Sequence, residues 1–210
     1  MNAAIQATKT AVRRVMRVIA RWLNIATRGH VTPNAVTIFG FLMHVPIAVL
    51  IATAHPLWAA LLLVIFGLFD TLDGELSRLQ KTSSVRGMLL DASTDRMKEV
   101  LLYGGVAYWL AGGAHPLNAV WATVACGASL CVSYVKAKGE AAVASGAKKI
   151  PHDVLNHMFK DGVLTFEMRM VVLVLGLVSG YLVWAVAVIA VLASYTAFQR
   201  LITISKALDA

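Results

Sequence analysis

Long apolar runs, separated by short polar or glycine-containing breaks, follow one another along this 210-residue chain. Each run has about 20 residues, the number that a helix rising about 1.5 Å per residue needs to cross a hydrocarbon layer about 30 Å thick. The breaks read AHP, SSVRG, GGAHP and SGY. The pattern predicts an all-α integral membrane protein with six transmembrane helices, over residues 34–54, 57–79, 88–111, 116–138, 166–183 and 184–204.

Apolar residues also recur at helical spacing before the first run, with basic residues between them. The apolar positions are Val12, Val15, Met16, Ile19, Trp22 and Leu23, and the basic ones are Arg13, Arg14, Arg17, Arg21 and Arg28. Such a segment is typical of a helix in the membrane interface, where arginines meet lipid phosphates; a dedicated substrate site is the alternative. We expect an amphipathic juxtamembrane helix over 1–30 and a membrane domain over 31–210, with Thr32 as the N-cap and Pro33 as the first residue of the first span.

The basic residues indicate how the chain is oriented. All 19 Lys and Arg residues fall before the first predicted span, around the junctions of spans two and three and of spans four and five, or at the end of the chain. Because Lys and Arg accumulate on the cytoplasmic side, we expect a multi-pass protein of the cytoplasmic (inner) membrane, with both termini and the longest connection, about 139–165, in the cytoplasm. A composition of 59% hydrophobic and 14% charged residues agrees. The net charge of +8 then belongs to a membrane face, and no nucleic-acid partner is expected.

Four aspartates lie at the cytoplasmic ends of the second and third predicted spans. Asp70 and Asp73 are three residues apart and Asp91 and Asp95 are four apart, so each pair shares one helix face. Four uncompensated carboxylates near the centre of a membrane would cost ~10–14 kcal/mol on insertion scales. The short SSVRG turn between the spans brings the two pairs together near the interface, where a divalent cation would remove their mutual repulsion.

Ligands that offer only oxygen favour Mg²⁺ or Mn²⁺ over zinc. Gly74 and Gly87 are positions where a backbone or ligand can approach closely, and Arg78 offers a planar set of donors to a phosphate beside the metal. The alternative is that the carboxylates only form salt bridges with the nearby cations Arg78, Arg86, Arg96 and Lys98.

The order of these residues resembles the signature of the CDP-alcohol phosphotransferases. That signature is Asp-x-x-Asp-Gly-x-x-Ala-Arg, eight residues, and then Gly-x-x-x-Asp-x-x-x-Asp. The chain matches it from Asp70 to Asp95, except that Ser77 stands where the family usually has alanine. VTPNAVT is similar to the entry of that family's first membrane helix, and the six spans extend the resemblance over nearly the whole chain.

The resemblance implies an enzyme that moves a phosphatidyl-type group from a CDP-linked lipid such as CDP-diacylglycerol to an alcohol and releases CMP. It also implies two metal ions, with Asp70, Asp73 and Asp91 as the main ligands and Asp95 as the general base that can also touch the second metal. Gly74, Ser77, Arg78 and Gly87 would face the CDP-lipid. A homodimer is implied as well, and Gly176 and Gly180 form a GxxxG pair that could pack helices within one chain or between two.

The acceptor alcohol depends on further resemblances and charges. LDASTDR around Asp91, GELSRL and SYVKAKGEA are similar to segments of the family branch that makes phosphatidylinositol phosphate, although Lys138 and Gly139 depart from that branch's commoner Arg-Ala. Inositol 1-phosphate is therefore the expected acceptor, and glycerol 3-phosphate is the alternative. Lys136, Arg169 and Arg200 could bind the acceptor's phosphate, or they could be ordinary cytoplasmic-side cations. A hypothesis from another class, a divalent-cation transporter, would instead place its carboxylates at the bilayer midplane.

Overall fold

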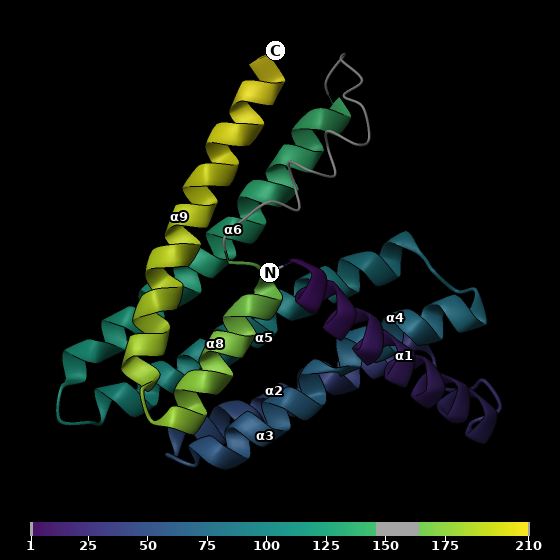
Figure 1. Cartoon of the computed structure of the whole chain (residues 1–210), viewed down its shortest axis with the longest axis horizontal. Helices are drawn as coiled ribbons and strands as arrows, with labels where there is room; N and C mark the ends of the chain where they lie inside the picture. The colour runs from purple at the N-terminus through teal and green to yellow at the C-terminus, as the bar shows by residue number, and fades with distance from the viewer. Residues whose placement is uncertain (1, 146–163, 210) are drawn as a thin grey trace. The chain divides into compact units, whose positions relative to one another are not determined.

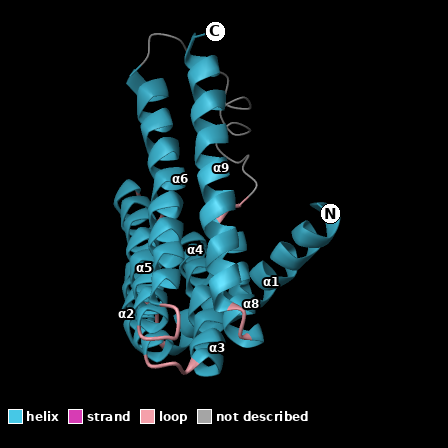
Figure 2. Cartoon of the chain, turned by 90° about the vertical axis from the view of Figure 1, so that its left-hand side faces the viewer, coloured by secondary structure: helices cyan, strands magenta, loops and turns pink. Residues whose placement is uncertain are grey.

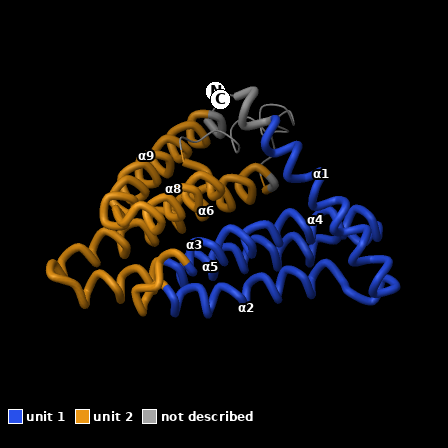
Figure 3. The backbone as a smooth tube through the Cα atoms, turned by 60° about the horizontal axis from the view of Figure 1, so that its bottom comes forward, with its two compact units in different colours: residues 1–50, 58–102 blue, residues 51–57, 103–210 orange. Residues whose placement is uncertain are grey.

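The computed structural model describes residues 2–145 and 164–209, and within these ranges every regular element is a helix (Figures 1 and 2). The α-helices are α1 (Asn2–Ala26), α2 (Pro33–Ala52), α3 (Pro56–Gly67), α4 (Phe69–Gln80), α5 (Val85–Ala111), α6 (Ala119–Ser145), α8 (Phe166–Ser179) and α9 (Leu182–Asp209), and a short 3₁₀ helix, η1, covers Pro116–Asn118. The chain forms two compact units, residues 1–50 with 58–102 (unit 1) and 51–57 with 103–210 (unit 2), which Figure 3 colours separately. The all-α prediction is confirmed. Most of the predicted connection over 139–165 lies outside the described residues.

Four described helical segments are long and apolar enough to cross a membrane: Pro33–Ala52, Pro56–Gln80, Pro116–Val143 and Leu182–Lys206. They correspond to the first, second, fourth and sixth predicted spans. The predicted spans over 88–111 and 166–183 are also helical, as α5 and α8, but they do not meet the same criteria. Helix α5 carries six charged residues, all before Val100, and α8 has only 14 residues.

The second predicted span is two helices rather than one. It breaks at Leu68, between α3 and α4, where the amide of Leu68 donates to the carbonyl of Ile65 and the amide of Thr71 donates to the carbonyl of Leu68. These three-residue steps tighten the backbone at a point where Gly67 already weakens the helix. The break begins a new helix directly before Asp70.

Aromatic packing fixes the start of α4 against α2. The rings of Phe39, Phe66 and Phe69 lie with centroids 5.1–6.1 Å apart. A Cβ atom added at Gly40 would lie 3.1 Å from the Cβ atom of Phe69, so the missing side chain at residue 40 allows this close approach. Because Phe69 precedes Asp70, this contact positions the first aspartate.

Helix α4 also packs on α1, and the two helices contribute to a hydrophobic cluster in unit 1. Met16 and Ala20 of α1 are buried with Val36, Leu72 and Leu76. The predicted N-terminal segment is helical, as α1, but its predicted apolar stripe divides. Val12, Met16 and Leu23 face the core, whereas Val15, Ile19 and Trp22 are exposed, Trp22 to 72%. The bond from the amide of Ala35 to Oγ1 of Thr32 at 3.2 Å confirms the predicted cap of α2.

In unit 2, α6 and α9 run side by side over most of their length, and α8 packs on α9 (Figure 1). A Cβ atom at Gly176 would collide with that of Ala185, so this glycine allows the close contact between α8 and α9 within one chain. Gly180 has another role, because it ends α8 with a φ of 79° in the left-handed region. The GxxxG pair is therefore not a continuous helix-packing face.

Candidate functional site

The turn between α4 and α5 places the four aspartates opposite one another in unit 1. Lys81 ends α4 in the left-handed conformation, and the amide of Gly87 donates to Oγ of Ser84 at 3.1 Å, which caps α5. The chain therefore reverses within a few residues. Asp70 and Asp73 from α4 then face Asp91 and Asp95 from α5, as the turn in the sequence predicted.

Three of the aspartates form a cluster that could hold a metal ion. Carboxylate oxygens of Asp70, Asp91 and Asp95 all lie within 4.8 Å of one another. Lys98, one turn after Asp95 on α5, donates from Nζ to Oδ1 of Asp70 and, at 3.2 Å, to Oδ1 of Asp95. The cluster thus already contains one cationic side chain.

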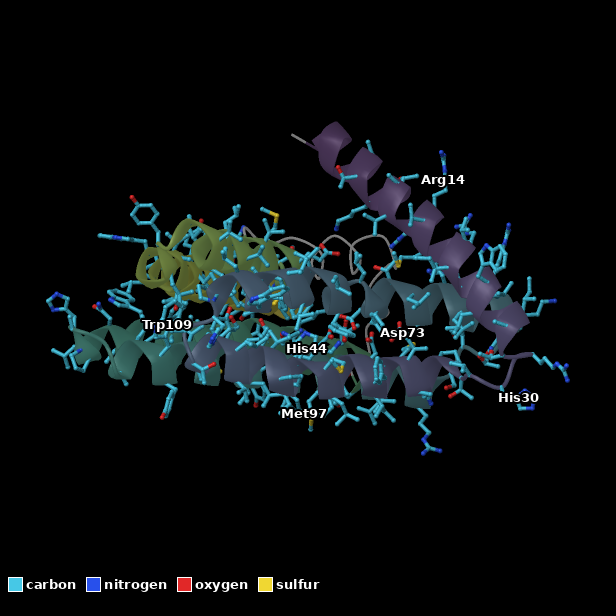
Figure 4. All side chains as sticks on the ribbon, turned by 90° about the horizontal axis from the view of Figure 1, so that it is seen from below. Arg14, His30, His44, Asp73, Met97 and Trp109 are labelled. Atoms are coloured by element: carbon cyan, nitrogen blue, oxygen red, sulfur yellow. The ribbon has the colours of Figure 1, made fainter. Side chains whose placement is uncertain are left out.

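Asp73 lies beside this cluster and has a different partner. Its Oδ2 atom accepts a hydrogen bond of 2.5 Å from Oγ1 of Thr37 on α2. The Asp73 side chain is buried and lies between the helices, whereas Arg14 and Met97 point outward (Figure 4). Thr37 thereby holds one oxygen of Asp73 and leaves the other available for a ligand.

A cavity of about 420 Å³, lined mainly by residues with polar side chains, opens next to Asp73 and Asp91. Four of the residues expected to face a CDP-linked lipid or its metal line it together with Asp91, namely Asp73, Gly74, Ser77 and Gly87. Side-chain hydroxyls and amides supply further lining from Thr32, Asn34, Thr37, Gln80, Thr82, Ser83 and Ser84. Such a wall offers many hydrogen-bond donors to a polar ligand.

The two signature glycines keep this cavity open. A Cβ atom at Gly87 would lie 3.3 Å from Oγ of Ser84 and 3.4 Å from Oδ1 of Asn34, and it would fill part of the wall. At Gly74 a Cβ atom would lie 3.6 Å from Nη2 of Arg78. A ligand group can therefore approach the backbone of both helices.

Arg78 lies next to the cavity but does not line it, and its guanidinium group is paired with a glutamate. Its Nη2 atom donates to Oε1 of Glu75 at 2.8 Å, while Arg17 of α1 donates to Oε2 of the same carboxylate at 3.0 Å. Glu75 is only 4% exposed, and both arginines are more than half exposed. Glu75 therefore aligns the Arg78 guanidinium and ties α4 to α1.

The three cations expected to bind an acceptor phosphate all belong to unit 2. Arg169 is buried and donates to the main-chain carbonyl of Leu164 at 3.1 Å, and Arg200 is buried and donates to that of Val132 at 3.3 Å. Lys136 is half exposed, with Nζ 3.8 Å from Oε1 of Glu140. The two arginine side chains are thus buried in the protein, whereas the Lys136 side chain lies at the surface.

The sequence alone does not predict the contacts of Thr37 and Glu75. It indicates Lys98 as a possible salt-bridge partner of the aspartates, and the structure shows these bonds to Asp70 and Asp95. The spacing of Lys98 from Asp95 also places it on the aspartate face of α5. Glu75 and Thr37 could have been noticed as polar residues beside the signature and in the VTPNAVT segment. Asp73, the partner of Thr37, and Arg17, one of the two partners of Glu75, lie on other helices, so these pairings needed the tertiary structure.

The cluster fits a divalent cation by its chemistry. Its donors are all carboxylate oxygens, the type that Mg²⁺ and Mn²⁺ prefer, and oxygens on opposite sides of such an ion lie about 4 Å apart. The Oδ1 atom of Asp91 is buried and has no hydrogen-bond partner among the described residues. A buried carboxylate oxygen without a donor is costly, and a bound cation would satisfy it.

Comparisons with known proteins identify the family of this chain. The family profile described as CDP-alcohol phosphatidyltransferase matches residues 30–192. The phosphatidylinositol phosphate synthase of Corynebacterium glutamicum is 40% identical over 114 residues, which are 53% of this chain and 52% of that protein. The chain thus spans about half the length of that relative.

Solved structures match over a larger share of the chain. The phosphatidylinositol phosphate synthase (PgsA1) of Mycobacterium tuberculosis with CDP-DAG bound has a TM-score of 0.76 and 27% identity, over 91% of this chain and 94% of that chain. The same protein in complex with manganese and citrate has a TM-score of 0.75 over 90% of this chain and 88% of that one.

Proposed function

This chain belongs to the CDP-alcohol phosphatidyltransferase family, and we propose that it transfers the phosphatidyl group of CDP-diacylglycerol to inositol 1-phosphate and releases CMP. The observation that carries the proposal is the carboxylate cluster of Asp70, Asp91 and Asp95 beside a cavity lined by the other signature residues. The names of the similar proteins support inositol phosphate as the acceptor over glycerol 3-phosphate. They give no support to a divalent-cation transporter.

Asp70, Asp73 and Asp91 would hold one or two Mg²⁺ or Mn²⁺ ions. The unpartnered Oδ1 of Asp91, within the described residues, and the one oxygen of Asp73 that Thr37 leaves available support this assignment. A bound divalent ion would neutralise part of the negative charge of the diphosphate. The nucleophile would then meet less electrostatic repulsion as it approaches the phosphorus. The manganese-bound structure of the similar synthase supports the choice of metal.

Asp95 is the proposed general base. The hydroxyl oxygen of the acceptor forms a bond to the phosphorus next to the lipid, the bond from that phosphorus to the CMP oxygen breaks, and CMP leaves with the electron pair. The hydroxyl proton passes to a carboxylate oxygen of Asp95. Asp95 is the last member of the cluster and is partly exposed, so an acceptor can reach it from solvent.

The cavity beside Asp73 is the proposed binding site for the nucleotide end of the CDP-lipid. Gly74 and Gly87 allow its phosphates to approach the backbone, Ser77 contributes a hydroxyl, and Arg78, aligned by Glu75, offers a charged donor at the rim. Lys136, Arg169 and Arg200 are proposed to bind the acceptor's phosphate. The chemistry of the side chains supports this, because guanidinium and ammonium groups form strong charge-assisted hydrogen bonds with phosphate oxygens.

We propose six membrane spans, α2, α3 with α4, α5, α6, α8 and α9, with both termini and the aspartates on the cytoplasmic side of the inner membrane. The one-sided distribution of all 19 Lys and Arg residues supports this orientation. The exposed Val15, Ile19 and Trp22 beside arginines support α1 as an interfacial helix. A homodimer is also proposed, on the family resemblance.

The experiment is a CMP-release assay on purified protein with CDP-diacylglycerol and one water-soluble alcohol at a time. CMP should form with inositol 1-phosphate, not without an acceptor, and not with excess chelator. Faster release with glycerol 3-phosphate would contradict the proposed acceptor, and metal flux without CMP formation would contradict the enzyme.

A further inference from the structure

Lys98 occupies the centre of the carboxylate cluster. Its side chain is 1% exposed, and Nζ donates to Asp70 on α4 and to Asp95 on α5. A buried ammonium loses its hydration and must recover that free energy from nearby anions. These two carboxylates explain why a lysine can be buried here.

The ammonium does not balance the charge of the cluster. In their ionised forms Asp70, Asp91 and Asp95 carry three negative charges, and Lys98 carries one positive charge. Arg96 also lies near the cluster, with Nη2 3.7 Å from Oδ2 of Asp95, but its closer partner at 2.6 Å is the buried carboxylate of Glu99. Because Arg96 and Glu99 cancel in charge, an excess of two negative charges remains. Lys98 bonds to Asp70 and Asp95 and not to Asp91, whose buried Oδ1 has no hydrogen-bond partner within the described parts of the chain. The remaining charge and the unsatisfied oxygen match one divalent cation.

The ammonium and a divalent ion would compete for the same oxygens. Lys98 bonds the Oδ1 atoms of Asp70 and Asp95, two members of the group that lies close enough to share an ion. An ion bound there would stand a few ångströms from Nζ, where two positive charges repel strongly. The Lys98 side chain can move its ammonium group away from the ion by changing rotamer, because the group is attached to a flexible four-carbon chain.

We propose that Lys98 is an internal cation that occupies the carboxylate cluster before a divalent ion binds and leaves Asp70 and Asp95 when the ion arrives. It holds α4 and α5 together without metal and weakens metal affinity, so that the site binds its ion reversibly. This inference rests on the metal site of the proposed function. Lys98 is a positioning residue in this account, since it acts through the two aspartates.

An ordinary structural salt bridge makes a different prediction. In that case, loss of Lys98 would destabilise the protein equally with and without metal and would leave metal affinity unchanged. Competition instead predicts opposite effects on the metal-free and metal-bound protein. Without metal, removing the ammonium destabilises the protein because the carboxylates are left unbalanced. With metal, it strengthens ion binding because the carboxylate oxygens are free for the ion.

The test uses the full chain in detergent, with Mn²⁺ as the probe and free Mn²⁺ measured by electron paramagnetic resonance. Lys98→Met should bind Mn²⁺ on the order of tenfold more tightly than the wild type, as expected when one repelling charge is removed from the site. Its thermal midpoint should be lower than the wild-type value in EDTA, and saturating Mn²⁺ should remove most of that difference. Lys98→Gln repeats the test with a polar side chain if the Met variant does not fold.

Two further variants make the result specific. Arg17→Met removes a positive charge from unit 1 whose bond is to Glu75 rather than to the cluster, and it should leave the Mn²⁺ affinity within about twofold of the wild type. Asp91→Asn should abolish the measured binding. Unchanged or weaker Mn²⁺ binding by both Lys98 variants would overturn the inference while leaving the metal site intact. If the wild type does not bind Mn²⁺, or if Asp91→Asn binds Mn²⁺ as tightly as the wild type does, both the metal site and the inference about Lys98 are overturned.

Discussion

At the scale of single residues, Asp91 is the position where chemistry and structure agree most closely. Its Oδ1 atom is buried and lacks a hydrogen-bond partner in the described part of the chain, although polar atoms in such places are normally satisfied. The neighbouring carboxylates would make this worse by repulsion unless a cation is bound. Without a bound cation, the carboxylates of this cluster are electrostatically unfavourable, as expected of a metal-binding site.

Asp91→Asn should therefore remove metal binding and transfer together. The amide cannot supply the charge that holds a divalent ion, so we expect activity to fall on the order of a hundredfold or more, the scale of effects seen when even supporting groups of metal sites are lost. Glu167→Gln, which removes an exposed carboxylate from α8, serves as the control and should behave like the wild type. Retained activity of Asp91→Asn in excess chelator would argue against the metal site.

The Asp95→Asn variant tests whether Asp95 acts mainly as the general base or mainly as a metal ligand. General-base assistance is worth typically ~10²–10⁴-fold and acts on the chemical step, so kcat should fall by more than CDP-lipid binding weakens. Steady-state kinetics and equilibrium binding of the nucleotide on the same preparation measure both quantities. A parallel loss of affinity and rate would assign Asp95 to the metal rather than to proton transfer.

At the scale of elements, hydrophobic patterning predicted where helices lie but not where they break. The apolar run over 57–79 reads as one span, and only the tightened backbone at Leu68 divides it into α3 and α4. The signature itself located Asp70, Asp73, Asp91 and Asp95 and the turn that joins them. The contacts of Thr37 with Asp73 and of Lys98 with Asp70 depend on distances between helices, which a periodic pattern does not encode.

Glycine positions allow a matched test of helix packing. Gly176→Ala places a methyl group against Ala185, and overpacking of this kind typically costs about 1–3 kcal/mol. Gly104→Ala is the control, because a Cβ atom there would meet nothing within 4 Å and alanine favours the helix. Thermal unfolding in detergent should show a lower midpoint for Gly176→Ala and an unchanged or higher one for Gly104→Ala. Equal midpoints would mean that α8 and α9 do not pack this closely.

At the scale of the whole molecule, each of the two compact units contains its own group of the residues named in the proposed function. The aspartates and the polar cavity belong to unit 1, while Lys136, Arg169 and Arg200 belong to unit 2. Loss of a charge-assisted hydrogen bond costs roughly 1.5–3 kcal/mol, so replacement of any of the three cations by Gln should raise the acceptor KM on the order of tenfold to a hundredfold. The KM for the CDP-lipid should change little.

Protein stability has to be measured alongside these kinetics. Arg169 and Arg200 also donate to the carbonyls of Leu164 and Val132, so their replacement can lower the thermal midpoint without any effect on binding. Lys136→Gln carries less of this risk because its side chain is half exposed. Unchanged acceptor KM values in all three folded variants would reject the phosphate-binding role and favour an unphosphorylated alcohol.

The most direct test of the central claim is transfer of labelled inositol 1-phosphate, with its phosphorus as the label, into lipid by the purified protein. With CDP-diacylglycerol and Mg²⁺ or Mn²⁺, the label should enter the lipid fraction in step with CMP release, and chelation or Asp91→Asn should abolish both. Label that stays in the aqueous phase while CMP is released, or incorporation that survives chelation, would contradict the account.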